Sequence, residues 1–362
     1  MTAALPRHLH PGAWWVWSIG LGVAATRTTN PVLLALVLGV AGYVVAARRS
    51  DAPWARAYVA FLKLGAFVLV VRMLLQIAFG QPLPGTVLFR LPEVDPPRWL
   101  AGIRLGGAVT AEAVVGQLYA GLRLGTLLAC VGAANALASP YRLLRALPGA
   151  LYEAGVAVTV ALAFAPQALV SAHAVREARR LRGRATRGPG SLRGLVVPVL
   201  EGALARSVQL AASMDARGYG RRAGPPSRAA AAAMFGGLLT LCVGTYGLLD
   251  PSTPPVLGFP AMAAGTALLG YALVRGSRRA ARSRYRPDVW RWPEWAVCAA
   301  GLVPPVALAL VDPAALQPST NPLVAPAVPL LAVLGVLVAL APAFVAPRPP
   351  STLPRTLRAA TA

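Results

Sequence analysis

Residues suited to metal binding and catalysis are scarce in this sequence. Its 362 residues include three histidines, three cysteines and twelve acids, while 56% are hydrophobic. Cys130, Cys242 and Cys298 stand alone within apolar runs, so there is no Cys-x-x-Cys pair for a metal or redox centre. The histidines form no His-Glu-x-x-His motif, and the acids are scattered along the chain. We therefore expect no catalytic residue, no metal site and no cofactor.

Lysine is almost absent as well. The one lysine, Lys63, follows Phe61-Leu62 in an apolar run and not a glycine-rich turn, so the sequence has no Walker A motif and the chain cannot itself be an ATPase. The remaining basic residues are arginines, which give most of a net charge of +23 and lie mainly in a few loops between apolar runs. This clustering is typical of a membrane topology signal.

Long apolar runs are what the sequence has in abundance. Runs of about 20 apolar residues are the signature of membrane-spanning helices, and a soluble core is excluded. We predict an all-α, polytopic membrane helix bundle with about eight spans. The predicted spans are residues 13–26, 31–47, 57–79, 107–136, 229–249, 255–274, 295–311 and 323–345.

The loop charges predict the orientation. A stretch at 176–222 carries eleven arginines against three acids, and 275–291 carries seven against one. Loops 48–56 and 137–148 and the tail from residue 347 are also basic, whereas the alternate loops are nearly neutral. The positive-inside rule places all five basic stretches, and both termini, in the cytoplasm.

A ninth apolar run, 151–170, competes for a place in the bilayer. If it spanned, the basic loops on its two sides would face opposite compartments, and every later loop would be inverted. Pro166-Gln167 near its end also suits a helix outside the hydrocarbon. We therefore predict four parts: an N-terminal bundle of four spans (10–136), cytoplasmic helices between the fourth and fifth spans (137–227), four C-terminal spans (228–346) and a cytoplasmic tail (347–362).

Besides Lys63, which lies near the cytoplasmic end of its span and can snorkel, three charged residues fall within predicted spans. Arg72 and Glu112 lie toward the outer half, and Arg123 shares a helix face with Glu112. Intramembrane charge indicates either pairing or a transport pathway. Because the other spans contain no acidic series, we predict structural pairing of Arg72 or Arg123 with Glu112.

The basic insert contains two predicted helices, each closing on an Arg-Gly pair. From Pro198 the second can run to Arg217, with one polar row and an opposite apolar face that can lie on the bundle. The polar row contains Arg206, Gln209, Ser213 and Arg217, and the first helix has a similar row with Arg176 and Arg180 before Arg182. Gly183 and Gly218 are predicted left-handed C-caps that leave an arginine at each helix tip. Such an arginine suits carboxylates or backbone carbonyls of a docking protein.

The insert resembles the transmembrane T component of energy-coupling-factor transporters, the family that includes CbiQ. The similar segments are Val175-Arg-Glu-Ala-Arg-Arg-Leu-Arg-Gly183 and Ala212-Ser-Met-Asp-Ala-Arg-Gly-Tyr219, together with Arg27-Thr-Thr-Asn-Pro31, Gly121-Leu-Arg-Leu124 and Phe164-Ala-Pro166. They cover roughly residues 10–250. The first signature departs from the family's Ala-Arg-Gly by reading Leu-Arg-Gly, and about three spans follow the family's usual end.

The resemblance implies a coupling role. In this family the signature arginines dock onto two ATP-binding-cassette ATPases, and the membrane helices hold a separate substrate-binding S component. Carried over, Arg182, Gly183, Ala216, Arg217 and Gly218 would contact the ATPases, and no nucleic acid would be bound. The cargo, a vitamin, a metal ion or another micronutrient, would be chosen by the S component.

Two other functions stay open from the residues alone. One is a membrane-embedded, lipid-modifying enzyme, which would need an acid cluster or an activated nucleophile that the sequence does not offer. The other is a membrane protein whose basic insert binds anionic lipid or another partner. Aromatic residues are not interleaved with these arginines, since Tyr219 stands alone among them, and this disfavours nucleic acid.

Overall fold

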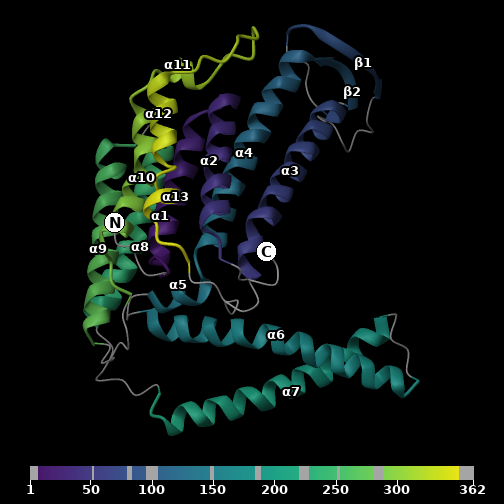
Figure 1. Ribbon diagram of the computed structural model, residues 1–362, viewed down its shortest axis with the longest axis vertical. Coiled ribbons are helices and arrows are strands. Elements are labelled where there is room, and N and C mark those ends of the chain that lie inside the picture. Colours follow the sequence, from purple (N-terminus) through teal and green to yellow (C-terminus); the bar gives the residue numbers. More distant parts are fainter. Residues whose placement is uncertain are drawn as a thin grey trace, which may run out of the picture. The chain divides into compact units, whose positions relative to one another are not determined.

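The described part of the chain is mostly helical (Figure 1). The computed structural model describes residues 7–50, 53–79, 84–94, 105–146, 151–183, 189–219, 228–250, 253–279 and 288–349. They divide into two compact units: unit 1, formed by Met1–Leu143 with Asp288–Ala362, and unit 2, formed by Leu144–Pro287. The predicted tail lies outside the described residues from residue 350 on.

Polar residues set the start of the first two helices of unit 1. Helix α1 (Pro11–Arg27) follows His10, whose Nδ1 accepts a hydrogen bond from the backbone N–H two residues on, at 3.1 Å. Helix α2 (Pro31–Arg48) follows Asn30, whose Oδ1 accepts one in the same way at 3.0 Å. Proline opens both helices, at a position where a backbone N–H would have no acceptor within the helix.

The next two long helices form a close antiparallel pair. Helix α3 (Ala57–Phe79) packs along α4 (Ala111–Leu137), and small residues allow this approach because a Cβ on Gly65 would lie 3.0 Å from the Cα of Gly125. Two antiparallel strands, β1 (Val87–Val94) and β2 (Leu105–Thr110), connect the helices. The predicted span 107–136 therefore begins at Ala111, because residues 107–110 belong to a strand.

The C-terminal part of the chain completes unit 1. Its helices are α10 (Trp292–Ala309), α11 (Pro313–Leu316), α12 (Leu330–Val338) and α13 (Pro342–Val345). Helix α10 packs along α1, while α12 and α13 contact α2 (Figure 1). The predicted span 323–345 is thus two short helices preceded by a non-helical segment that contains two prolines, which cannot donate the backbone hydrogen bonds of a helix.

Hydrogen bonds tie this C-terminal part to the first two helices. The Thr28 hydroxyl donates to the backbone carbonyl of Leu316 at 2.7 Å, and both groups are buried. The Trp17 indole donates to the carbonyl of Ala339 at 3.1 Å from within the core. The turn between α1 and α2 is therefore fixed by residues almost 290 positions later in the chain.

The core of unit 1 is apolar and closely packed. Trp17, Leu21, Val297 and Val336 are almost fully buried, with exposed fractions below 2%. A Cβ built on Gly20 would lie 2.0 Å from the carbonyl oxygen of Gly301, so helices α1 and α10 approach to backbone contact. Neither position has room for a side chain.

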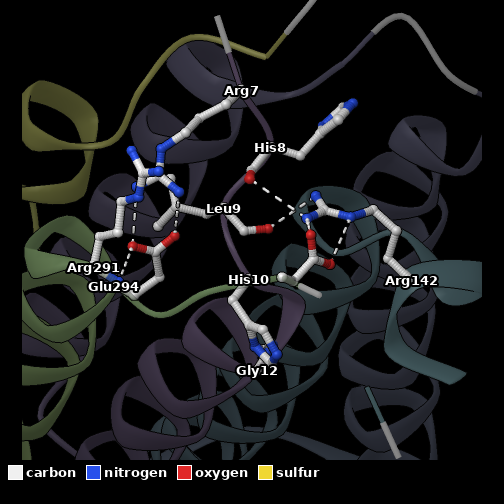
Figure 2. Close-up of polar contacts among 9 residues, drawn as sticks. Arg7, His8, Leu9, His10, Gly12, Arg142, Arg291 and Glu294 are labelled. Atoms are coloured by element: carbon white, nitrogen blue, oxygen red, sulfur yellow. Dashed lines mark hydrogen bonds and ion pairs between the residues drawn. The ribbon is translucent and has the colours of Figure 1, made fainter. Parts of the chain in front are cut away.

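Charged contacts gather at one end of unit 1, around the N-terminal segment (Figure 2). Arg7 forms two hydrogen bonds with Glu294, at 2.8 and 3.0 Å, and the Glu294 side chain is fully buried. Arg142, from α5 (Pro140–Ala146), pairs with Asp288 at 2.7 Å and donates to the carbonyl of Leu9 at 3.0 Å. The N-terminal segment and parts of the loops 137–148 and 275–291, all predicted to be cytoplasmic, thus meet at the same end of this unit.

The described part of unit 2 contains four long helices. Helices α6 (Tyr152–Leu181) and α7 (Pro189–Ala216) contact each other, and α8 (Arg228–Leu249) pairs closely with α9 (Phe259–Arg279) after a short 3-10 turn. Helix α7 begins at Pro189 and includes Pro198, so the predicted start of this helix at Pro198 is wrong. A proline keeps helical φ and disturbs only the turn before it.

Among the described residues, six helices are long and apolar enough to cross a membrane: α2, α3, α4, α6, α7 and α8. Four of them match predicted spans. The other two, α6 and α7, are the helices that charge parity places in the cytoplasm, so length and composition alone do not separate the two kinds of helix. The predicted number of eight spans and the location of the termini stay predictions.

The close approach of α1 and α10 gives a direct stability test. Gly20→Ala would force a methyl group against the Gly301 backbone, and overpacking of this kind costs about 1–3 kcal/mol. We expect a lowered melting temperature for the purified chain in detergent. The matched control is Gly39→Ala in α2, where a Cβ meets no atom within 4 Å and helix propensity predicts a neutral or slightly stabilising change. Equal melting temperatures for the two variants would contradict the observed packing.

Candidate functional site

The helices of the basic insert pack with two arginines between them. The Arg206 Nη2 of α7 donates to the Ser171 hydroxyl of α6 at 3.1 Å. Arg179 of α6 lies against Gly194 of α7, where a Cβ would meet its guanidinium group. These arginines fix the pair and are not on its open surface.

The end of α7 is a complete glycine-terminated cap. The N–H of Tyr219 donates to the carbonyl of Met214 at 3.0 Å, and the N–H of Gly218 donates to that of Asp215 at 2.8 Å. This is the double hydrogen-bond pattern of a Schellman motif. Gly218 has φ +74°, a conformation that costs a residue with a Cβ about 1–2 kcal/mol. The predicted left-handed cap at Gly218 is confirmed.

Helix α6 also ends on a glycine with a positive φ. Gly183 has φ +66°, and its N–H donates to the carbonyl of Arg180 at 3.0 Å. The N–H of Arg182 donates to the carbonyl of Ala178 at 3.2 Å, which keeps Arg182 as the last residue of the helical turn. The predicted cap at Gly183 is also confirmed.

Both caps leave an arginine at the helix tip. Arg182 and Arg217 each precede the left-handed glycine, and both side chains are exposed. Within the part of the chain that the structure describes, their guanidinium groups make no hydrogen bond or ion pair. Each is a planar, permanently charged donor available to carboxylates or backbone carbonyls of another protein.

The supporting residues divide into two groups. Arg176, Arg180, Gln209 and Ser213 are exposed, as a docking surface requires. The prediction that Arg206 lies on the exposed polar row of α7 is wrong. Its side chain is half-buried and donates a hydrogen bond to Ser171 of α6. A helical wheel shows which residues share a face and does not show which face another helix covers.

The apolar face of α7 is exposed within unit 2. Val197, Leu200, Leu204 and Val208 follow helical spacing and are 55%, 55%, 66% and 69% exposed. Helix α6 contacts the side of α7 that carries Arg206 and not this stripe. That Leu200 and Leu204 lie on the membrane bundle stays a prediction.

The three intramembrane charges have other partners than those predicted. Glu112, near the start of α4, accepts hydrogen bonds from the backbone N–H of Thr86 at 2.9 and 3.0 Å. Arg72 donates to the Gln117 side chain at 2.9 Å. Neither forms the predicted ion pair, because the turn before β1 covers Glu112. Their structural role stays a prediction.

Arg123 bonds elsewhere as well. Its guanidinium donates to the backbone carbonyl of Thr26, at the end of α1. The helix C-terminus supplies carbonyls without partners inside the helix, which a cation satisfies. In the described ranges, no group of three or more His, Cys, Asp or Glu side chains could hold a metal ion.

The mostly helical fold, with its six apolar helices of spanning length, is that of a multi-pass membrane protein. The sequence model of CbiQ, described as a cobalt transport protein, matches residues 3–226, and the chain belongs to this family. The matched range contains both arginine-glycine helix ends and stops before α8 and α9. A search of curated proteins finds no match to the chain.

The glycine cap of α7 can be tested without changing Arg217. Gly218→Ala should weaken the end of α7 by about 1 kcal/mol, since alanine resists a positive φ. We expect hydrogen exchange of the backbone amides at positions 218 and 219 to accelerate roughly fivefold, the factor that corresponds to this energy. Gly218→Asn is the control, because asparagine tolerates the left-handed region. Identical exchange in the Ala and Asn variants would contradict the cap.

Proposed function

We propose that this chain is the membrane coupling subunit of an energy-coupling-factor type importer. The observation that carries the proposal is the pair of exposed arginines, Arg182 and Arg217, each held at a helix tip by a left-handed glycine. Membership of the CbiQ family supports a transport role. The absence of a Walker A motif from the full sequence requires that ATP be hydrolysed by partners.

Two ATPase subunits are the proposed partners of the helix ends. Ala216-Arg217-Gly218 would enter a groove on one ATPase, and Arg182-Gly183 a groove on the other, with acidic groups or backbone carbonyls accepting the guanidinium N–H donors. The exposed residues Arg176, Arg180, Gln209 and Ser213 would line the surrounding contact. Closure of the ATPase dimer would then move the two helix tips relative to each other.

Motion has to pass from these tips to a substrate-binding partner. Helices α6 and α7 can act as levers, since Arg206 and Arg179 join them along their length. The open stripe from Val197 to Val208 on α7 is suited to an apolar partner surface, which we assign to the S component. Transport would be a rigid-body rearrangement.

The cargo is not chosen by this chain in the proposed scheme. The family description names cobalt, and we assign the chain to micronutrient uptake on that basis. The S component would supply the binding site for the cargo.

The docking proposal predicts the effect of reversing charge at each tip. Arg182→Glu and Arg217→Glu should each reduce co-purification of co-expressed ATPases, and the double variant should abolish assembly and uptake. The loss of one charge-assisted contact costs on the order of 2 kcal/mol, or about 30-fold in affinity.

Arg49→Glu is the matched control. Arg49 is also an exposed arginine at a helix C-cap, but it has an extended conformation and no following glycine. Its reversal should leave ATPase assembly unchanged. Normal assembly and uptake in the Arg182/Arg217 double variant would exclude the proposed docking site.

The cytoplasmic location of α6 is a separate prediction. In a chain with its three native cysteines replaced by alanine, Val158→Cys introduces a thiol at a 46% exposed position of α6. A membrane-impermeant maleimide added to intact cells should not label this thiol, but should label it in inverted vesicles. Ser319→Cys, on the predicted outer side, should react in intact cells. Labelling of the Val158→Cys variant from outside would show that α6 crosses the bilayer.

A further inference from the structure

A basic pocket lies at the end of unit 1 where α2 leaves its apolar run. Several separate segments contribute to its wall, including the N-terminal segment, the end of α2, the turn before α3 and the start of α5. Its polar lining is formed by Arg7, His8, Arg48, Ser50, Ser139 and Arg142, with Trp54 beside them. The pocket therefore combines cations, hydroxyl donors and an aromatic wall.

Two of the three arginines already have acidic partners. Arg7 is paired with Glu294 at 2.8 Å, and Arg142 is paired with Asp288 at 2.7 Å (Figure 2). These two ion pairs fix the positions of Arg7 and Arg142 and neutralise their charges. The third arginine, Arg48, is in neither pair.

Arg48 is the arginine of this pocket that has no acidic partner among the described residues. One of its Nη atoms donates to the carbonyl of Ala343, while its Nε is buried without a hydrogen-bond partner. No described carboxylate contacts it. Arg348 stands between Pro347 and Pro349, which line the same pocket as Arg48, and its positive charge opposes that of Arg48. A buried donor and two like charges together favour an anion that can accept from both arginines.

The aromatic residues at this end indicate where that anion comes from. Trp54 and Tyr141 form an edge-to-face pair with ring centroids 6.5 Å apart. Trp292 and Trp295, at the start of α10, are 69% and 65% exposed. Tryptophan and tyrosine concentrate at the boundary between hydrocarbon and headgroups, next to lipid phosphates.

We propose that this pocket binds the headgroup phosphate of an anionic phospholipid in the cytoplasmic leaflet. Arg48 donates to the phosphate oxygens together with the hydroxyls of Ser50 and Ser139, which line the pocket. Arg348, which is exposed between the lining residues Pro347 and Pro349, reaches the phosphate from the rim. Basic pockets between membrane helices on the cytoplasmic side are suited to such headgroups. The site lies in unit 1, apart from the two arginine-glycine helix ends, and does not depend on ATPase docking.

The site also gives the C-terminal segment a part in lipid recognition. Arg348, Pro347 and the Ala343 carbonyl all lie beyond residue 226, where the CbiQ match ends. A phosphate between Arg48 and Arg348 joins α2 to this segment and replaces their repulsion with two attractive contacts. Lipid binding thereby stabilises the packing of α13 on α2.

Native mass spectrometry of the purified full-length chain tests the site. The protein in neutral detergent is titrated with dioleoyl phosphatidylglycerol or dioleoyl phosphatidylcholine, and the fraction with one bound lipid is measured. Phosphatidylglycerol should bind more tightly, and Arg48→Gln or Arg348→Gln should weaken it about fivefold, without affecting phosphatidylcholine. Arg348→Gln removes no hydrogen bond between described residues, so this variant should keep the fold. It therefore tests the site even where the Arg48→Gln variant does not fold. Arg49→Gln, an exposed neighbour outside the pocket, should bind as the unchanged protein does.

Three results would overturn the proposal. The first is unchanged phosphatidylglycerol binding in both the Arg348→Gln variant and a correctly folded Arg48→Gln variant. The second is an equal loss in Arg49→Gln, which indicates diffuse attraction to a basic surface. The third is complete displacement of phosphatidylglycerol by millimolar inorganic phosphate, which assigns the pocket to the free anion. Normal ATPase assembly in the Arg348→Gln variant keeps this test separate from the docking proposal.

Discussion

The permanent charge of arginine is the constraint on which this structure depends. A guanidinium group does not lose its proton in a protein, so it needs a partner or water, and hydrocarbon offers neither. Arg7 and Arg142 meet carboxylates, while Arg72 and Arg123 meet an amide and a helix-end carbonyl. The arginines left exposed, Arg182 and Arg217 among them, are those available to other molecules. Charge thus links the topology, the packing and the proposed function.

Local features of this arrangement could be predicted from the sequence, and contacts between distant residues could not. Glycine after a helical pattern is a local signal, and both predicted caps at Gly183 and Gly218 are present. The partner of Arg206 depends on which side of α7 meets α6, and the partner of Glu112 depends on a turn 26 residues earlier. The hydrogen bond from Thr28 to Leu316 joins residues 288 positions apart, so no local sequence pattern could predict it. Such contacts arise only when separate elements pack.

The residues after the CbiQ match are part of the architecture of the membrane unit. Helix α10 reaches backbone contact with α1 at Gly20 and Gly301, and the turn between α1 and α2 is held by the C-terminal part of the chain. The Arg27-Thr-Thr-Asn-Pro31 segment, which resembles a family motif, lies at this junction. The extra helices of unit 1 therefore complete the same bundle as the N-terminal helices. The pair α8 and α9 packs chiefly on itself.

The most direct measurement of the central claim is photo-crosslinking from the two helix tips in the assembled complex. A photoreactive amino acid replaces Leu181, which is 84% exposed beside Arg182, or the exposed Ala216 beside Arg217, so both arginines are kept. We expect crosslinks to an ATPase subunit from each position, and none from the same photoreactive residue placed at Tyr43 in α2, which is 52% exposed. Absence of ATPase crosslinks from both tips, in complexes that contain the ATPases, would contradict it.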